Sequence, residues 1–405
     1  SMLETSSLNG REDVDRRPWR IFRAVAVGHF GIDVFSSMTP VLVAFLRGPL
    51  AMSGAQMGLA VGLAQFLSGA TQPIFGWVVD RVGTRIIGPV SVAWTMSCVS
   101  LAIVTAPLAE SYLLFVGLIA LGALGSGAFH PQGTMHAATA LVGRGATTTS
   151  IFFFCGQLGL ATGPALSGSI LDAYGPLGVG LCGVVFLSIP LFMATQMGSR
   201  AANPAPSAVV VATQEQERPR TSVATALLLA GVFGFRAWAF IGTAAFLPIL
   251  FQEKGWSTTG QGFVTGSFWL GGGAAGVVAG ILADRLGRRA LVSVTTLLGS
   301  LPLFFLPQSE GAGAFALALL AGALLGAPHS TLMVIAQDLL SVRRGLASGL
   351  ALGFFFAAGA LSSLAIGTLA DWFALAPVLQ AGALTGVVAA ALSLLLPSST
   401  GERPA

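Results

Sequence analysis

The chain has 405 residues, of which 54% are hydrophobic and only 9% are charged, and its formal net charge is +4. Soluble domains carry roughly 25% charged residues, so a soluble fold of this composition would lack the polar side chains to cover its surface. The basic excess does not indicate nucleic-acid binding, because the basic residues are scattered through short segments between apolar runs. The composition therefore predicts a membrane protein.

Apolar runs of the length needed to cross a bilayer, about 20 residues, recur along the chain. The first six are 21–46, 55–79, 86–107, 113–140, 147–171 and 178–197. The other six are 222–251, 259–282, 290–307, 312–340, 345–370 and 375–396. A polar, proline-containing segment, 198–221, separates the two sets and predicts a linker. We therefore expect an all-α membrane protein of twelve transmembrane helices in two six-helix bundles, 21–197 and 222–396, with tails at 1–20 and 397–405.

The basic residues predict the orientation of these helices. Of the 20 Lys and Arg residues, 17 lie in the tails, in the linker, in the loops of one side or, for Arg23, at the start of the first run. The other three are Arg47, Lys254 and Arg236. Because cytoplasmic loops are enriched in Lys and Arg, we expect both termini in the cytoplasm. We expect the chain to cross the cytoplasmic (inner) membrane several times. An even number of crossings is needed for that result.

The two sets of helices match one another in sequence. Segments 76–85 and 280–289 read GWVVDRVGTR and GILADRLGRR, and each falls between the second and third run of its set. His130-Pro131 in the first set corresponds to Pro328-His329 in the second, and Asp172 corresponds to Asp371. Internal duplication of this kind is typical of secondary transporters, whose site lies between the repeats.

Charged residues within apolar runs are the first candidates for the site, because a charge near the bilayer centre costs at least about 2.5 kcal/mol. Asp33, His130, Arg236 and His329 lie near the middle of four different runs, which predicts a central cavity at the bilayer midplane. Asp33 and Arg236 occupy equivalent places in the two halves. We expect them to form an ion pair across the empty cavity, which a proton or an anionic substrate would break.

The acid and its neighbour predict proton coupling. Protonation would neutralise Asp33 and ease its passage between access states. His29, one helical turn away, is placed to hydrogen-bond Asp33 or to relay a proton; the alternative is a histidine bonded to a neighbouring helix. The forked guanidinium of Arg236 suits a carboxylate, phosphate or phosphonate on the substrate. The alternatives are that Arg236 only tunes Asp33, or that the two form a fixed structural ion pair.

His130 and His329 each lie beside a proline, which bends a helix and frees a backbone carbonyl. We expect both to bind substrate, the alternative being a kink with a hydrogen-bonded histidine. Further candidates for the substrate site are polar or aromatic residues of the same helices: Gln157, Gln132, Trp238, Phe153 and Phe354. No acid or cysteine supports the two histidines at metal-ligand spacing, so we expect no metal.

The repeated segment carries a family resemblance. Two copies of G-x-x-x-D-R-x-G-x-[RK] after the second and eighth helices resemble the signature of the major facilitator superfamily. The resemblance implies that this segment latches the halves together when the cavity opens outward, with close helix crossing at its glycines. It marks as gating residues Gly76, Asp80, Arg81, Arg85, Gly280, Asp284, Arg285 and Arg289.

Two finer resemblances concern direction and substrate. The run Gly159–Gly168, which includes Gly163 and Pro164, is similar to the glycine–proline motif of proton-coupled drug exporters, although Ser167 replaces one of its glycines and Ser150 stands where its first glycine should be. We count Gly163 and Pro164 among the gating residues. The segments 29–33, 127–132 and 236–238 resemble the fosmidomycin-resistance branch of the superfamily. This branch implies efflux of a drug or small metabolite driven by inward proton flow.

These observations predict a proton-coupled exporter of a small molecule with an anionic group; the alternative is a proton symporter that takes up a small organic anion. An enzyme is not expected, because no nucleophile–base pair or nucleotide-binding loop is present. We expect a monomer whose partners are its substrate, protons and the lipid bilayer, with no nucleic acid and no cofactor beyond the proton gradient.

Overall fold

The computed structural model describes residues 2–141, 144–197, 221–342 and 344–397, and within these ranges all regular structure is helical. The helices of the first half are α1 (Met2–Leu46), α2 (Gly54–Ala70), α3 (Gln72–Val82), α4 (Thr84–Leu108), α5 (Tyr112–Thr139), α6 (Gly145–Phe186) and α7 (Ser188–Met197). Those of the second half are α8 (Val223–Ala237), η1 (Trp238–Gly242), α9 (Thr243–Glu253), α10 (Thr258–Leu286), α11 (Arg288–Phe305), η2 (Leu306–Gln308), α12 (Gly311–Gly326), α13 (His329–Leu339), α14 (Arg344–Ala370) and α15 (Leu375–Leu394).

The membrane crossings agree with the predicted runs. Nine helical segments of the described residues are long and apolar enough to span a bilayer. One of them, Thr147–Met197, has 51 residues, too many for one crossing, and its backbone breaks at Gly175, where φ is 63°. With that segment divided, and with α2–α3 and α10 also crossing, the described helices accommodate the twelve predicted crossings.

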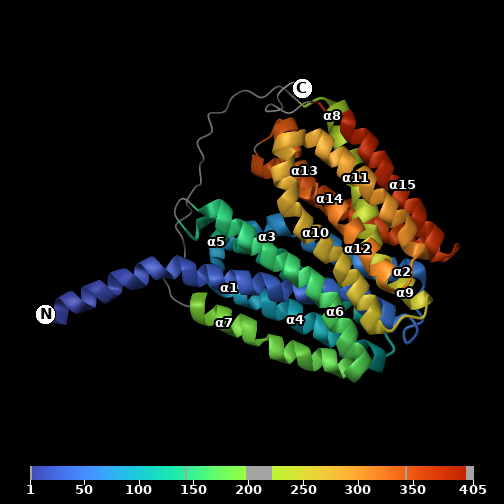
Figure 1. Cartoon of the computed structure of the whole chain (residues 1–405). Coiled ribbons are helices and arrows are strands. Elements are labelled where there is room, and N and C mark those ends of the chain that lie inside the picture. The colour runs from blue at the N-terminus through green and yellow to red at the C-terminus, as the bar shows by residue number, and fades with distance from the viewer. Residues whose placement is uncertain (1, 142–143, 198–220, 343, 398–405) are drawn as a thin grey trace.

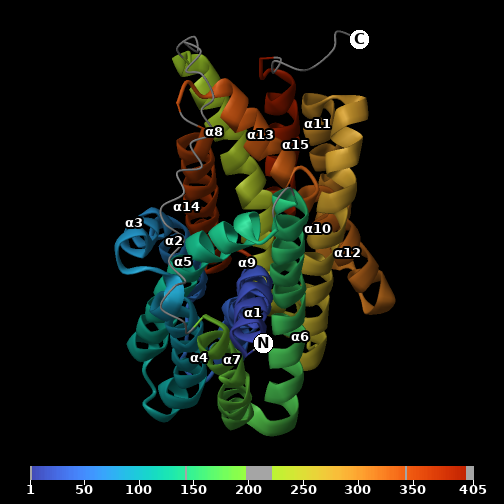
Figure 2. The same cartoon turned by 90° about the vertical axis from the view of Figure 1, so that its left-hand side faces the viewer.

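The chain forms two bundles, α1–α7 and α8–α15, which lie side by side in both views (Figures 1 and 2). The first bundle ends at Met197 and the second begins at Val223. The predicted linker, 198–221, lies outside the described residues except for its last position, so the division into domains stays a prediction. Residues 2–20, predicted as a tail, instead continue α1 as helix, and this end projects away from the bundles (Figure 1).

The helices that carry Pro131, Pro328 and Arg236 differ in whether the helix continues regularly at or near that residue. α5 continues through Pro131 without interruption, whereas Pro328 separates α12 from α13. The seventh predicted helix is interrupted by η1, a π-helical turn that begins two residues after Arg236. Such turns are rare and frequently occur at functional sites. Nothing in the apolar periodicity predicts this one.

Small residues bring the bundles into close contact along two seams. In the α6–α10 seam, a Cβ added to Gly262 would collide with the carbonyl oxygen of Pro164. In the α2–α14 seam, one added to Gly58 would collide with the carbonyl oxygen of Ser363. Backbones approach this closely only where a side chain is absent, which is how membrane helices commonly pack.

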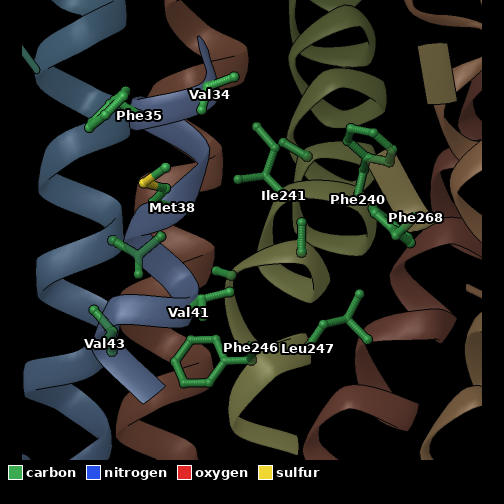
Figure 3. Close-up of a cluster of buried hydrophobic side chains, with 14 of the residues drawn as sticks. Val34, Phe35, Met38, Val41, Val43, Phe240, Ile241, Phe246, Leu247 and Phe268 are labelled. Atoms are coloured by element: carbon green, nitrogen blue, oxygen red, sulfur yellow. The ribbon is translucent and has the colours of Figure 1, made fainter. Parts of the chain in front are cut away.

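Apolar side chains fill the space between α1 and η1–α9. Val34 and Val41 of α1 face Ile241 and Phe246 of the other bundle, and all four are buried (Figure 3). The two halves therefore share one continuous apolar core, which places the middle of α1 against the other half.

Candidate functional site

Asp33 lies in the middle of α1 between two histidines. Its Oδ2 atom is 3.2 Å from Nε2 of His29, and its Oδ1 atom is 3.6 Å from Nε2 of His130 in α5. Phe152 of α6 stacks on His29, with ring centroids 4.0 Å apart. We call these four side chains the Asp33 cluster. Because two helices besides α1 contribute to it, its geometry depends on how α1, α5 and α6 pack.

The position of His29 and Asp33 depends on glycines of α6. A Cβ added to Gly156 would collide with the His29 ring and lie 2.8 Å from Asp33 Oδ2, and one added to Gly159 would lie 3.0 Å from the Cβ of Asp33. Gly163, one turn further along, contacts the carbonyl of Val34 in the same way. These glycines let α6 approach α1 closely enough to bury the carboxylate.

Arg236 forms the corresponding site in the second half. Its side chain is fully buried. Nη2 donates to the carbonyl oxygen of Leu325 at 2.6 Å, and Nη1 lies 3.5 Å from Nδ1 of His329. The guanidinium carbon is 5.2 Å from the ring centre of Phe355. We call Arg236, His329 and Phe355 the Arg236 cluster.

The break at Pro328 explains this environment. α12 ends at Gly326, so its last carbonyl groups have no partner within the helix. The negative end of the helix dipole also lies there and favours a cation. Arg236 therefore caps α12 and holds its own charge against backbone dipoles.

The predicted ion pair between Asp33 and Arg236 is not formed. Within the described part of the chain, Asp33 makes its ion pairs with the two histidines, and Arg236 makes hydrogen bonds with α12 carbonyls. The prediction is wrong for this conformation because each charge finds partners inside its own half.

The two clusters are related by the internal duplication. Phe152 precedes Phe355 by the same offset that separates Asp33 from Arg236, and His130 and His329 are also equivalent. The predicted site residues Phe153 and Phe354 are half-exposed, whereas their buried neighbours Phe152 and Phe355 lie in the clusters. The shared offset was the signal that could have identified them.

Other predicted site residues lie elsewhere. Gln132 is fully buried against Gly88 of α4. Residues two apart on a helix point about 200° apart, so Gln132 lies on the opposite face of α5 from His130, which points to Asp33. Gln157 contacts Gly273 across the α6–α10 seam, and Trp238 lies against Gly382 of α15. Phe153 lies at the rim of the Asp33 cluster, with its ring centroid 6.0 Å from that of His29. Phe354 faces Gly234 of α8.

The Asp33 cluster has the spacing of a small cation site. One nitrogen or oxygen atom from each of His29, Asp33 and His130 lies within 4.8 Å of the others. No metal was expected, because no acid lies at metal-ligand spacing from the histidines in the sequence, whereas the fold brings Asp33 to His29 and His130. The spacing suits a proton or a metal ion.

Contacts between the halves gather at one end of the molecule, which we call the latched end. Asp371, after α14, accepts hydrogen bonds from the backbone N–H groups of Gly54 (2.5 Å) and Ala55 (2.9 Å) at the start of α2. Asp172 of α6 accepts hydrogen bonds from Thr258 (3.2 Å) and Thr259 (2.7 Å) at the start of α10. Each half thus caps a helix of the other. Asp172 and Asp371 correspond in the duplication, but neither was among the predicted gating residues.

The predicted gating residues lie mostly at the opposite end, which we call the basic end. Asp80 is exposed and forms no ion pair with any described residue, and Arg81 lies over the Trp77 ring, 3.9 Å from its centre. Among the described residues, only Pro131 lies within 4 Å of a Cβ added to Gly76, at an ordinary 3.8 Å, so they form no close crossing there in this conformation. At the described residues of the first copy, the predicted latch is therefore open in this conformation.

In the second half, the equivalent segment makes different contacts. Arg289 donates to the carbonyl of Leu396 at 2.8 Å, and Arg288, which the sequence analysis did not select, pairs with Asp338 at 2.7 Å. Arg85 and Arg285 are exposed. The side-chain environments of Gly280 and Asp284 lie outside the described residues. Gly163 and Pro164 lie at the α1–α6 and α6–α10 contacts.

A fold of two related helical bundles, with buried charges in each, defines a membrane transporter and not an enzyme. Residues 25–246 and 227–405 match the family model described as Major Facilitator Superfamily. The chain belongs to this superfamily, as its repeated motif predicted.

Known proteins resemble the chain along most of its length. It is 26% identical to the "Fosmidomycin resistance protein" of Escherichia coli (strain K12), over 88% of this chain and 87% of that one. It is 28% identical to the "Uncharacterized MFS-type transporter YfnC" of Bacillus subtilis (strain 168), over 92% of each. Among solved structures, a bacterial homolog of the human lysosomal transporter Spinster, titled as inward-facing and occupied, superposes with a TM-score of 0.75 (14% identity, 94% of this chain, 97% of that one). The xylose transporter XylE from E. coli gives 0.73 (16% identity, 94% and 98%).

Proposed function

We propose that the chain is a proton-coupled exporter of a small molecule with an anionic group. The observation that carries the proposal is the Asp33 cluster, a carboxyl group buried between two histidines in the middle of a spanning helix. A buried acid of this kind costs free energy that protonation removes. Proton binding therefore has a direct effect on the helix that touches both halves.

The Arg236 cluster supports an anionic substrate. The Nε atom of Arg236 is buried and has no hydrogen-bond partner among the described residues. Since arginine can only donate, Nδ1 of His329 must accept from it, which leaves the hydrogen of His329 on Nε2. Two N–H donors, one of them on a permanent cation, are thus available for a carboxylate, phosphate or phosphonate.

Export is supported by the glycine–proline run of α6 and by the E. coli relative, which is named for fosmidomycin resistance. We infer that the basic end faces the cytoplasm, with both termini there, in the cytoplasmic membrane. On this orientation, a molecule closed at the latched end takes substrate from the cytoplasm. We also infer that the chain acts as a monomer and that the proton gradient is its energy source.

Uptake by proton symport is the second candidate. One observation favours symport. Asp33 and Arg236 lie in separate clusters, so a proton on Asp33 and an anion at Arg236 could be bound at the same time. Antiport needs the two to exclude one another.

Proteoliposomes with an imposed pH gradient test these proposals, with labelled fosmidomycin as the first probe and other organic anions chosen by thermal-stability screening. We expect extrusion against the substrate gradient when protons flow inward. In Asp33→Asn, we expect this flux to fall at least tenfold. Accumulation in place of extrusion would support symport. Full proton-driven flux in Asp33→Asn would reject proton coupling through this residue.

A further inference from the structure

The backbone determines which nitrogen of each cluster histidine carries a hydrogen. Nδ1 of His29 lies 2.7 Å from the carbonyl oxygen of Phe152, and Nδ1 of His130 lies 2.7 Å from that of Ser126. A carbonyl oxygen can only accept, so both Nδ1 atoms donate. In the neutral histidines, both Nε2 atoms therefore carry a bare lone pair, and both face the Asp33 carboxyl group.

This arrangement requires a cation among the three side chains. With Asp33 ionised and both histidines neutral, nitrogen lone pairs would face carboxylate lone pairs at 3.2 and 3.6 Å, and a net negative charge would be buried. One proton between Asp33 Oδ2 and His29 Nε2 removes the buried net charge and the lone-pair repulsion at 3.2 Å, since that contact is within hydrogen-bonding distance. It leaves the three groups neutral in total. Only the longer contact with His130, at 3.6 Å, keeps two facing lone pairs.

No other charge of the described residues competes for this role. Among the described residues, the aromatic side chains beside the histidine rings, Phe129, Phe152 and Phe153, are not titratable. The hydroxyl of Ser126, 3.5 Å from Nδ1 of His130, carries no charge, and α6 meets Asp33 with glycines. No further charged group of the described residues forms an ion pair with the three. A divalent metal ion would leave a net positive charge in the same buried site, which favours the proton.

The three side chains differ in their access to solvent. The side chains of His29 and Asp33 are 3% and 8% exposed, whereas that of His130 is 21% exposed. His130 is therefore the most exposed of the three. The sequence analysis assigned it to the substrate site, but its hydrogen bond and ion pair both lie on the side of the acid.

We propose that His29, Asp33 and His130 hold the coupling proton as one unit, with the proton between Asp33 and His29 and with His130 as the member through which it enters and leaves. This rests on the proposed function and deepens it: His130 belongs to the proton site and not to the substrate site. After loss of the proton, the Nε2 lone pair of His130 in α5 faces the charged carboxylate of Asp33 in α1 and is repelled by it. Deprotonation therefore weakens the contact between α1 and α5.

Infrared difference spectra of the reconstituted protein, recorded through a pH titration, test this without any substrate. We expect one carboxyl band that disappears in Asp33→Asn. In His130→Gln, the amide can donate to the carboxylate and stabilise its ionised form, so the midpoint of that band should move to lower pH by about one unit. The matched control is His136→Gln: His136 lies on the same helix, but it bonds to Thr84 Oγ1 at 2.8 Å and should leave the midpoint unchanged.

An unchanged midpoint in His130→Gln would overturn the three-residue unit, as would a spectrum that changes when a chelator removes metal. A different result would reject proton coupling through Asp33, namely full proton-driven flux in Asp33→Asn. If Asp33→Asn loses flux while His130→Gln keeps the wild-type midpoint, the proposed function stands and the unit does not.

Discussion

Arg236 is a permanent charge buried without a carboxylate partner among the described residues. Its stabilisation comes from the carbonyl groups at the end of α12, from His329 and from the faces of Phe355 and Phe240, whose ring centres lie 5.2 and 5.8 Å from the guanidinium carbon. Dipoles and aromatic faces lower the cost of the charge without cancelling it. An anion that reaches Arg236 therefore gains more than it would from an arginine already paired with an acid.

Arg236→Lys tests this reasoning. A single ammonium group cannot bond the α12 carbonyl and an anion in the geometry of a guanidinium fork. We expect the anion concentration that gives half of the thermal protection to rise about tenfold, equivalent to about 1.4 kcal/mol. The measurement is a thermal-shift titration with fosmidomycin or another phosphonate that protects the wild type. Arg81→Lys, at an exposed position far from the cluster, is the control. Undiminished protection in Arg236→Lys would argue against recognition by both arms of the fork.

At the scale of elements, the contact between α1 and α6 decides the geometry of the acid. Gly156, Gly159 and Gly163 follow one face of α6, and each meets the α1 backbone or the side chains of the Asp33 cluster. The packing that holds the two helices together thus also sets the distance between His29 and Asp33. Stability and proton binding should respond to the same substitutions.

Gly156→Ala should therefore affect both properties. The added methyl group would collide with the His29 ring, which cannot move away without losing its bond to Phe152. We expect a loss of about 1–3 kcal/mol in stability, seen as a lower unfolding temperature, together with a shifted carboxyl band. Gly117→Ala in α5 is a suitable control, because nothing lies within 4 Å of its added Cβ. A Gly156→Ala protein with wild-type melting and spectrum would show that the contact is less tight than described.

At the scale of the whole molecule, two kinds of charged contact join the halves at the latched end. Asp172 and Asp371 accept charge-assisted bonds from the first turns of α10 and α2, where the helix dipole adds to the attraction. Arg47 and Glu253 also pair across the halves at 2.8 Å, but their side chains are 37% and 40% exposed. Exposed pairs contribute little, so the two aspartates should dominate closure.

The double variant Asp172→Asn/Asp371→Asn should open the latched end more often. If each carboxylate contributes about 1 kcal/mol as a helix cap, their joint loss would shift the balance between the two access states by roughly thirtyfold. Distances between spin labels on the loops after α1 and α9 would report the shift. Arg47→Gln, the control, should change them little. A larger effect of Arg47→Gln than of the double variant would reverse this ranking.

Orientation is a further prediction for the whole molecule. Single cysteines placed in the loops at the basic end, such as beside Arg81, should react with a membrane-impermeant reagent only after cells are opened. Cysteines beside Glu310 should react in intact cells. The reverse pattern would contradict the charge-based orientation.

The sequence by itself determined the crossings, the duplication, the family and the two buried charges, because the cost of placing a polar group in lipid is a property of each local segment. Helix ends agree with the predicted runs within a few residues except at α1. Only the tertiary structure decided which groups meet. The rotation of each helix brought Phe152 and Phe355 to the clusters in place of their neighbours. The end of α12 at Pro328 supplied carbonyls to Arg236, and the packing of α1 on α5 and α6 gave Asp33 two histidines in place of the arginine. Such pairings depend on the relative placement of several helices, which no single segment of the sequence encodes.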